Sequence, residues 1–146
     1  MTKINRISIH GFKSFAHKTD IPFDKKYNVI LGPNGSGKSN VGDAVCFVLG
    51  RLSAKSMRAE KAANLIFNGG KSKKPANQGT VEMAFCNENK VFPHDAKEVL
   101  LSRTITKKGS SVYKINGKKR TRTEVLDTLS HAKINPDGYN MILQGD

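Results

Sequence analysis

The hydrophobic positions at the start of the chain follow the two-residue period of a β-strand. Ile7 and Ile9 fall on one face of a predicted strand over residues 3–10. A second, weaker strand is expected over 18–23, and the apolar run over 27–31 is short enough to be a buried strand. Three strands in close succession predict a sheet near the start of the chain.

The period then changes to that of a helix. Apolar residues recur at helical spacing after residue 40 and stop before Gly50, which predicts a helix over 40–49. The basic segment that follows favours a short helix over 55–63. The stretch 68–75, rich in glycine and lysine, is typical of a loop.

From Gly79 onward the two-residue period returns. It predicts strands over 80–85, 98–105 and 111–115, and the pair Asn116-Gly117 is a strong hairpin signal. Together these strands predict an antiparallel sheet.

A second helix and a last strand follow. The helix is expected over 124–131, with Thr121 or Thr123 as its N-cap. Its inward residues would be Val125, Leu126 and Leu129, and an apolar run over 139–143 predicts the strand. The whole pattern predicts an α/β fold with α+β character, in which a mixed sheet includes an antiparallel subsheet.

A glycine-rich stretch separates the apolar run over 27–31 from the first helix. It reads Gly32-Pro33-Asn34-Gly35-Ser36-Gly37-Lys38-Ser39, the phosphate-binding form G-x-x-x-x-G-K-[ST]. Loop N–H groups and the positive end of the helix dipole can hold phosphates. Lys38 supplies a charge to the β- and γ-phosphates, and the Ser39 hydroxyl is a ligand for Mg²⁺. The sequence therefore predicts a site for ATP and Mg²⁺.

The acidic half of such a site has no counterpart in the pattern. Hydrolysis needs an acidic residue after an apolar strand, to hold Mg²⁺ and orient the attacking water. No run of four apolar residues followed by Asp-Glu occurs, and Val125-Leu126-Asp127 falls in a predicted helix. We expect the chain to bind the nucleotide without supplying a catalytic acid.

The charge of the chain points to a polyanionic partner. The 146 residues carry 25 Lys+Arg against 12 Asp+Glu, a formal net charge of +13. This excess favours nucleic acid first and an acidic membrane second. No aromatic ladder accompanies the basic residues, so we expect sequence-independent contacts with the DNA backbone. The candidates around the antiparallel strands are Arg103, Lys107, Lys108, Lys114, Lys118, Lys119, Arg120 and Arg122.

Other kinds of site have little support. Cys46 and Cys86 form no C-x-x-C pair and suit buried thiols in a reducing cytosol, and the four histidines show no metal-ligand spacing. No apolar run approaches the roughly 18 residues of a membrane span. These features predict a soluble, intracellular protein of one domain.

Three stretches together resemble the N-terminal head lobe of structural maintenance of chromosomes (SMC) proteins, of prokaryotic or archaeal type. They are Ile9-His10-Gly11-Phe12-Lys13-Ser14-Phe15, the phosphate loop through Asn40, and Ile142-Leu143-Gln144-Gly145-Asp146. The resemblance covers essentially the whole chain. It implies an ABC-type ATPase fold and a single head lobe over 1–146. The family's coiled coil, hinge and C-terminal lobe have no counterpart in these residues, so we expect a fragment of a split head.

The resemblance also implies roles for individual residues. Lys13 and Ser14 would lie against the nucleotide, together with the loop residues from Gly32 to Asn40. Gln144 would contact Mg²⁺ and the attacking water, so that Ser39 and Gln144 are the expected metal contacts. Arg58 would be the arginine linked to DNA-stimulated hydrolysis, a choice made by position alone among three neighbouring basic residues, Lys55, Arg58 and Lys61.

For the protein as a whole, the resemblance implies ATP-driven engagement of heads on DNA in chromosome condensation and segregation, in the cytoplasm and at the nucleoid. The implied partners are the C-terminal head lobe, a second head joined through the hinge and the ATP-engaged heads, a kleisin-type subunit and DNA. Hydrolysis is expected only when the C-terminal lobe and a second head complete the site.

Three alternatives remain open on the sequence alone. The nearest is the N-terminal lobe of a related coiled-coil DNA-repair ATPase of the RecN or RecF type, against which the Gly-Phe-Lys-Ser-Phe stretch argues. A small nucleotide kinase would need an arginine-rich lid after the loop, where this chain has predicted antiparallel strands. A pure nucleic-acid module would leave the phosphate loop unexplained.

Overall fold

The computed structural model describes residues 4–13, 15, 17–22, 36–50, 65–66 and 76–134, with Pro22 and residues 36–41 as backbone only. The predicted strands over 27–31 and 139–143, the short helix over 55–63 and the loop 68–75 lie outside the described residues. In the described residues, no helix is long and apolar enough to cross a membrane.

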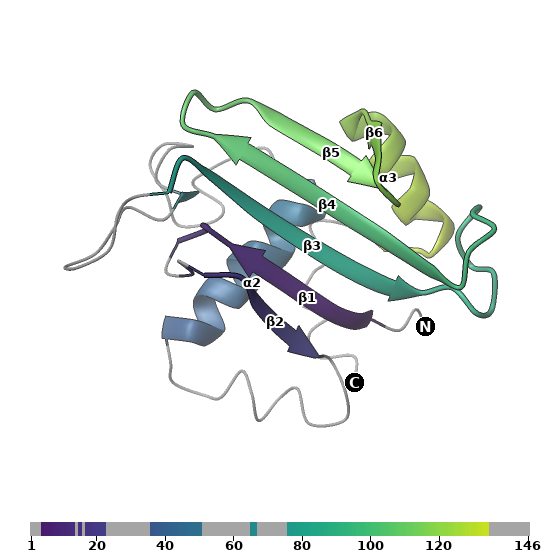
Figure 1. Ribbon diagram of the computed structural model, residues 1–146. Coiled ribbons are helices and arrows are strands. Elements are labelled where there is room, and N and C mark those ends of the chain that lie inside the picture. Colours follow the sequence, from purple (N-terminus) through teal and green to yellow (C-terminus); the bar gives the residue numbers. More distant parts are fainter. Residues whose placement is uncertain are drawn as a thin grey trace.

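Six strands form one antiparallel sheet in the order β2-β1-β3-β4-β5-β6 (Figure 1). Their bounds are β1 Ile4–His10, β2 Thr19–Pro22, β3 Gln78–Cys86, β4 Glu98–Thr106, β5 Ser111–Ile115 and β6 Lys118–Arg120. Strand β1 pairs with β2 on one side and with β3 on the other. Helix α2 (Ser36–Val48) lies between β2 and β3 in the chain. Helix α3 (Arg122–His131) follows the last strand.

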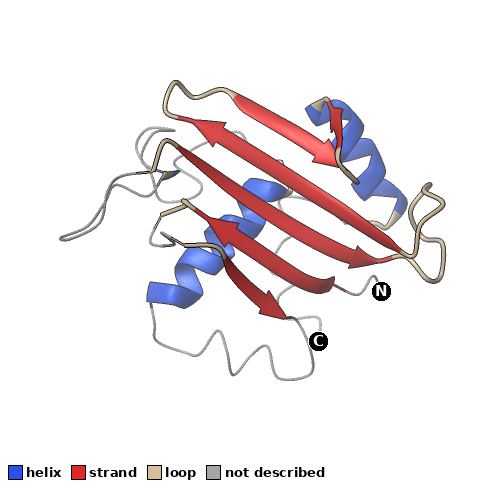
Figure 2. Cartoon of the chain, viewed as in Figure 1, coloured by secondary structure: helices blue, strands red, loops and turns tan. Residues whose placement is uncertain are grey.

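Both helices pack against the same face of the sheet, which we call the inner face (Figure 2). Strand β4 shows the alternation most clearly, since its odd-numbered residues from Val99 to Ile105 are buried and its even-numbered ones are partly exposed. Val81, Met83 and Phe85 of β3 are fully buried on the same face, as the two-residue period predicts. Helix α2 covers β3 and β4, and Val125 and Leu129 of α3 lie over β5.

The turn between β5 and β6 takes the form that its sequence predicts. Asn116 and Gly117 have φ angles of 50° and 83°, and two positive φ values in a two-residue turn match the twist of a hairpin. The Asn116 side chain also accepts a hydrogen bond from the Leu100 N–H at 2.7 Å. Strand β6 itself was not predicted, because Lys118–Arg120 has no apolar residue to show a period.

Helix ends follow the predicted caps. Gly50, just after α2, has a φ of 105°, where glycine is favoured. Thr121 caps α3 and forms a reciprocal capping box with Glu124, which selects it over Thr123. Leu126 is only partly buried, so the inward face of α3 is narrower than predicted.

Candidate phosphate-binding site

Helix α2 begins at Ser36, inside the glycine-rich motif and four residues before the predicted start. Residues 36–39 therefore form its first turn, where the backbone N–H groups have no partners within the helix. The first turn contains no acidic side chain, so no negative side-chain charge there neutralises the positive end of the helix dipole. This backbone arrangement suits phosphate oxygens.

Several predicted site residues lie outside what the structure describes. They are Ser14, Gly32, Pro33, Asn34, Gly35, Lys55, Arg58 and Gln144, and of Ser36, Lys38, Ser39 and Asn40 only the backbone is described. Their assignments to ATP, Mg²⁺ or DNA stay predictions.

The turn after β1 lies against the middle of α2. Gly11 and Lys13 have φ angles of 68° and 50°, and the Gly11 N–H donates to the Phe15 carbonyl at 2.6 Å. A side chain at Gly11 would collide with the carbonyl oxygen of Gln78, so glycine is required there. Phe12 is fully buried and its ring lies 5.0 Å from that of Phe47 on α2.

Lys13 joins this turn to the phosphate-loop helix through an ion pair. Its Nζ donates to Asp43 Oδ2 at 2.7 Å, and the two side chains are 14% and 10% exposed. Asp43 lies four residues, about 6 Å of helix, beyond Ser39. The ammonium group of Lys13 therefore bonds the helix itself, and its predicted contact with the nucleotide stays a prediction.

The predicted DNA role of Arg103 is wrong on its geometry. Arg103 is 5% exposed and points into the core between β4 and α2. Its Nη1 donates to the Phe47 carbonyl at 2.9 Å and its Nε donates to Ser111 Oγ at 3.1 Å. A guanidinium buried against backbone is not available to the DNA backbone. The strand pattern carried the signal, since Arg103 has the same parity as Leu101 and Ile105.

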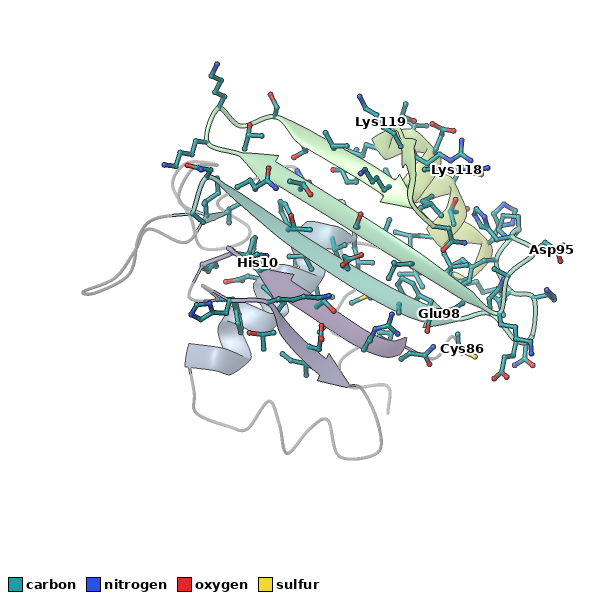
Figure 3. The ribbon with its side chains drawn as sticks, viewed as in Figure 1. His10, Cys86, Asp95, Glu98, Lys118 and Lys119 are labelled. Atoms are coloured by element: carbon teal, nitrogen blue, oxygen red, sulfur yellow. The ribbon has the colours of Figure 1, made fainter. Side chains whose placement is uncertain are left out.

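The pleat of β5 and β6 divides four other candidates between two faces. Lys119 pairs with Lys114 on the outer face, the side of the sheet away from the helices. Lys118 and Arg120 pair with Ile115 and Tyr113, which are buried, and so belong to the inner parity at the edge beside α3. Lys118 and Lys119 extend from the β6 edge, distant from His10 at the end of β1 (Figure 3).

The last three basic candidates differ in their exposure to solvent. Lys107 and Lys108 are exposed in the turn between β4 and β5. Arg122 is partly buried, and its Nε donates to the Gly50 carbonyl at 2.7 Å. The eight candidates therefore do not form one continuous basic rim.

Acidic and metal-binding groups are sparse where the structure describes the chain. No cluster of three His, Cys, Asp or Glu residues that could hold a metal ion occurs in the described residues. Asp127 lies on α3, as predicted, and its carboxylate is 3.7 Å from His131. Cys46 is buried, whereas Cys86 is partly exposed, less buried than predicted.

Sequence reasoning missed Asp43. Its position four residues after Ser39 places both on one face of the predicted helix, which is the signal that could have drawn attention to it. What the sequence could not show is that Lys13, thirty residues earlier, meets it there.

Comparison with known proteins decides between the alternatives. Residues 3–138 match the family model of the RecF/RecN/SMC N terminal domain. The chain belongs to this family.

Within the RecF/RecN/SMC family, the chain is similar to Smc proteins. It is 50% identical over 147 residues to the Chromosome partition protein Smc of Pyrococcus furiosus, an alignment that covers 100% of this chain. The chain spans only 12% of the length of that relative.

Two solved structures give the same result. A Pyrococcus furiosus Smc head domain with an extended coiled coil, bound to the C-terminal domain of ScpA, is 46% identical with a TM-score of 0.86, covering 96% of this chain and 35% of that one. A structure from work on ATP-driven dimerization and DNA-stimulated activation of SMC ATPases is 50% identical with a TM-score of 0.87, covering 98% of this chain and 87% of that one. The predicted SMC-type head lobe and its α/β fold are confirmed.

The RecF-type alternative is the more distant one. A structure of the recombination mediator protein RecF is 22% identical with a TM-score of 0.59, and it covers 86% of this chain and 30% of that one. This is a likeness of fold alone, so the SMC assignment is favoured.

Proposed function

We propose that the chain is the ATP-binding lobe of an SMC-type head ATPase, which acts on DNA through ATP-driven engagement of two heads. The observation that carries the proposal is the start of α2 at Ser36, within the G-x-x-x-x-G-K-S motif. The first-turn amides of α2 suit the β- and γ-phosphates of ATP. Bound Mg²⁺-ATP would supply the phosphoanhydride bond that is cleaved during ATP hydrolysis.

The residues of the chain have separate tasks in this proposal. Lys38 neutralises charge on the phosphates, Ser39 and Gln144 hold Mg²⁺, and Ser14 lies against the nucleotide. Lys13 holds α2 through Asp43, which supports a place beside the same site. The proposed lobe contains no catalytic acid, so cleavage requires a C-terminal head lobe.

Binding and turnover test these tasks separately. We expect Mg²⁺-ATP to bind the chain in isothermal titration calorimetry and Lys38→Ala to weaken binding by about tenfold or more, because a charge-assisted contact is worth about 1.5–3 kcal/mol. Turnover by the chain alone should be negligible and should appear on adding a C-terminal head lobe. Robust turnover of the pure chain, abolished by Lys38→Ala, would overturn the split site.

Protein partners are proposed from the relatives. One similar Smc head is bound to the C-terminal domain of ScpA, and another belongs to work on ATP-driven dimerization. We propose a kleisin-type subunit and a second head as partners of the whole protein, at the nucleoid in the cytoplasm. Size-exclusion chromatography with light scattering, with and without ATP, tests head engagement once the C-terminal lobe is present.

DNA contact is proposed for the exposed cations. The observation that supports it is the adjacency of Lys114 and Lys119 on the outer face, with Lys107 and Lys108 exposed in the turn between β4 and β5. Arg58, with Lys55 beside it, is proposed as the arginine that links DNA to hydrolysis. Such contacts give sequence-independent, salt-dependent binding.

Paired variants separate the two faces of the β5–β6 hairpin. We expect Lys114→Met with Lys119→Met to reduce the slope of log K against log salt by about two units for duplex DNA, because each lost phosphate contact accounts for about one. Lys118→Met with Arg120→Gln removes the same charge from the other face and should change the slope less, and Lys90→Met in the β3–β4 loop is a further control. Equal slopes for both pairs would show that the pleat does not select the DNA contacts.

A further inference from the structure

Helix α2 has no basic residue of its own in its last turn, yet one arginine from elsewhere contacts a carbonyl of that turn, and another contacts the Gly50 carbonyl two residues past the end of the helix. Arg103 of β4 donates to the Phe47 carbonyl at 2.9 Å, and Arg122 of α3 donates to the Gly50 carbonyl at 2.7 Å. They are 56 and 72 residues away in sequence from those carbonyls. The last carbonyls of a helix lack partners within it and form the negative end of its dipole. Arg103 therefore adds a second hydrogen bond to the Phe47 carbonyl, which also accepts from the Gly50 N–H, and Arg122 fixes the segment that directly follows α2.

Arg103 is held in a single orientation. Its guanidinium lies 4.2 Å from the centre of the Phe47 ring and 5.0 Å from that of Tyr113. Burial lowers the pKa of Arg103, an effect that the nearby Tyr113 opposes. The group still remains protonated at neutral pH, because arginine titrates far above it. A planar fork stacked between two rings fixes the carbonyl that it bonds more firmly than a flexible ammonium would.

Tyr113 belongs to the same cluster. Burial raises the pKa of Tyr113, and the charges of Arg103 and Arg122 oppose the increase. Within the described part of the chain, the Tyr113 hydroxyl has no hydrogen-bond partner in good geometry. Tyr113 therefore contributes its ring to the cluster.

Two other contacts also anchor α2, one of them in the same last turn. Phe12 packs on Phe47, and Lys13 bonds Asp43 in the second turn. Helix α2 has 13 residues, so its first and last residues are about 18 Å apart along the helix axis. At that distance the direct Coulomb interaction of the arginines with a phosphate is several times weaker than that of a contact pair. We therefore expect the arginines to affect the first turn of α2 mainly through the position in which they hold the helix.

We propose that Arg103 and Arg122 are positioning residues for ATP. They hold the C-terminal end of α2 against the sheet and so fix where its first-turn amides meet the phosphates. The inference rests on the proposed ATP site. It adds that part of the nucleotide affinity is set at the opposite end of the helix, by residues that touch no phosphate.

Arg122 gives the cleaner test, because it is only partly buried. We expect Arg122→Gln to weaken Mg²⁺-ATP binding by about three- to tenfold, as the competent placement of α2 becomes less populated. Arg122→Lys should recover most of the affinity, since an ammonium can still donate to the Gly50 carbonyl. The control is Arg6→Gln, a surface arginine paired with Glu98 on the outer face, which should bind as the unmodified chain does.

Arg103→Lys tests the stacked fork. A lysine keeps the charge but cannot bond the Phe47 carbonyl and Ser111 Oγ while lying between two rings. We therefore expect no recovery at this position, in contrast to Arg122→Lys. If Arg122→Gln and Arg103→Lys lower the melting temperature but leave ATP affinity unchanged, the two arginines are structural only and the inference is overturned.

Amide hydrogen exchange without nucleotide keeps the inference separate from the proposed function. We expect faster exchange along α2, including its first half, in Arg122→Gln but not in Arg6→Gln. If the unmodified chain fails to bind Mg²⁺-ATP, the proposed function fails, and this measurement still decides how α2 is held. Exchange that matches the control throughout α2 would overturn the inference.

Discussion

The two faces of the antiparallel sheet carry basic residues in different surroundings. On the inner face, Arg103 is buried between two aromatic rings and bonds a helix carbonyl. On the outer face, Lys114 and Lys119 lie side by side and exposed. The residues belong to adjacent strands and differ in the parity of the pleat. The comparison teaches that a positive net charge describes the chain, whereas the period of each strand decides which cations meet solvent.

The largest expected effect is at the inner face. Arg103→Ala should reduce the free energy of unfolding by about 3 kcal/mol or more, because it removes two hydrogen bonds and two ring contacts and leaves a cavity. Urea denaturation measures this change. Arg103→Met fills the cavity and shows how much of the loss is volume. A loss as small as that of an exposed lysine would show that the two faces do not differ.

An intermediate effect is expected for the Lys13–Asp43 pair, which is neither fully buried nor exposed. Lys13→Met and Asp43→Asn should each cost about 1–3 kcal/mol, since each takes the ion pair away from a partly buried charge. The double variant should cost less than the sum, with a coupling of about 1 kcal/mol in a double-mutant cycle. Additive losses would mean that the ion pair contributes nothing beyond its separate groups.

A smaller effect is expected for Glu98 on the outer face. The hydrogen bond from Asn5 lowers the pKa of Glu98 below its ordinary 4.5, partial burial opposes this, and Arg6 lowers it further. A carboxylate with a lowered pKa in the folded state stabilises the protein above the unfolded value and loses that contribution as pH falls through the folded value.

The pH dependence of unfolding checks this direction. Between about pH 5 and pH 3, the stability of Glu98→Gln should fall less steeply than that of the unmodified chain, because it lacks this group. The size should be modest, since the Arg6–Glu98 pair is exposed to solvent. Identical acid limbs for the two proteins would contradict the assignment.

The smallest effect on stability is expected for Lys114→Met and Lys119→Met. Each should change the free energy of unfolding by about 0.5 kcal/mol or less, because exposed side chains lose little on substitution. Their like charges repel across the strands, so the substitutions can even stabilise the sheet. A large loss on urea denaturation would place these lysines in a structural network and weaken their proposed DNA role.

The sequence predicted the periodic elements and their caps. Ile7 with Ile9 marked β1, Asn116-Gly117 marked the last hairpin, and Gly50 marked the end of α2, since each signal is local in the chain. Strand β6 was missed because its three residues are all charged and its pairing comes from the turn before it.

The sequence predicted the type of the candidate site, a phosphate-binding site, but not the contacts around it. The glycine-rich motif indicated phosphate binding, and the start of α2 at Ser36 agrees with it. The ion pair of Asp43 with Lys13 could not be predicted, nor could the division of the basic residues between the two faces of the sheet. Both depend on which segments of the chain pack against each other. Arg103 had the right strand parity for burial, and the sum of the charges outweighed that signal in the prediction.

By itself, the sequence determined that this chain is a basic, phosphate-loop lobe of the SMC type, because the motifs and periods that define it lie within short stretches of the chain. Only the tertiary structure decided which cations are exposed and which hold the phosphate-loop helix. Arg103 and Arg122 reach carbonyl groups 56 and 72 residues away, a contact that exists only once the sheet has packed on α2. The physical reason is that charge is a property of a residue, whereas the partner that gives the charge its role comes from the fold.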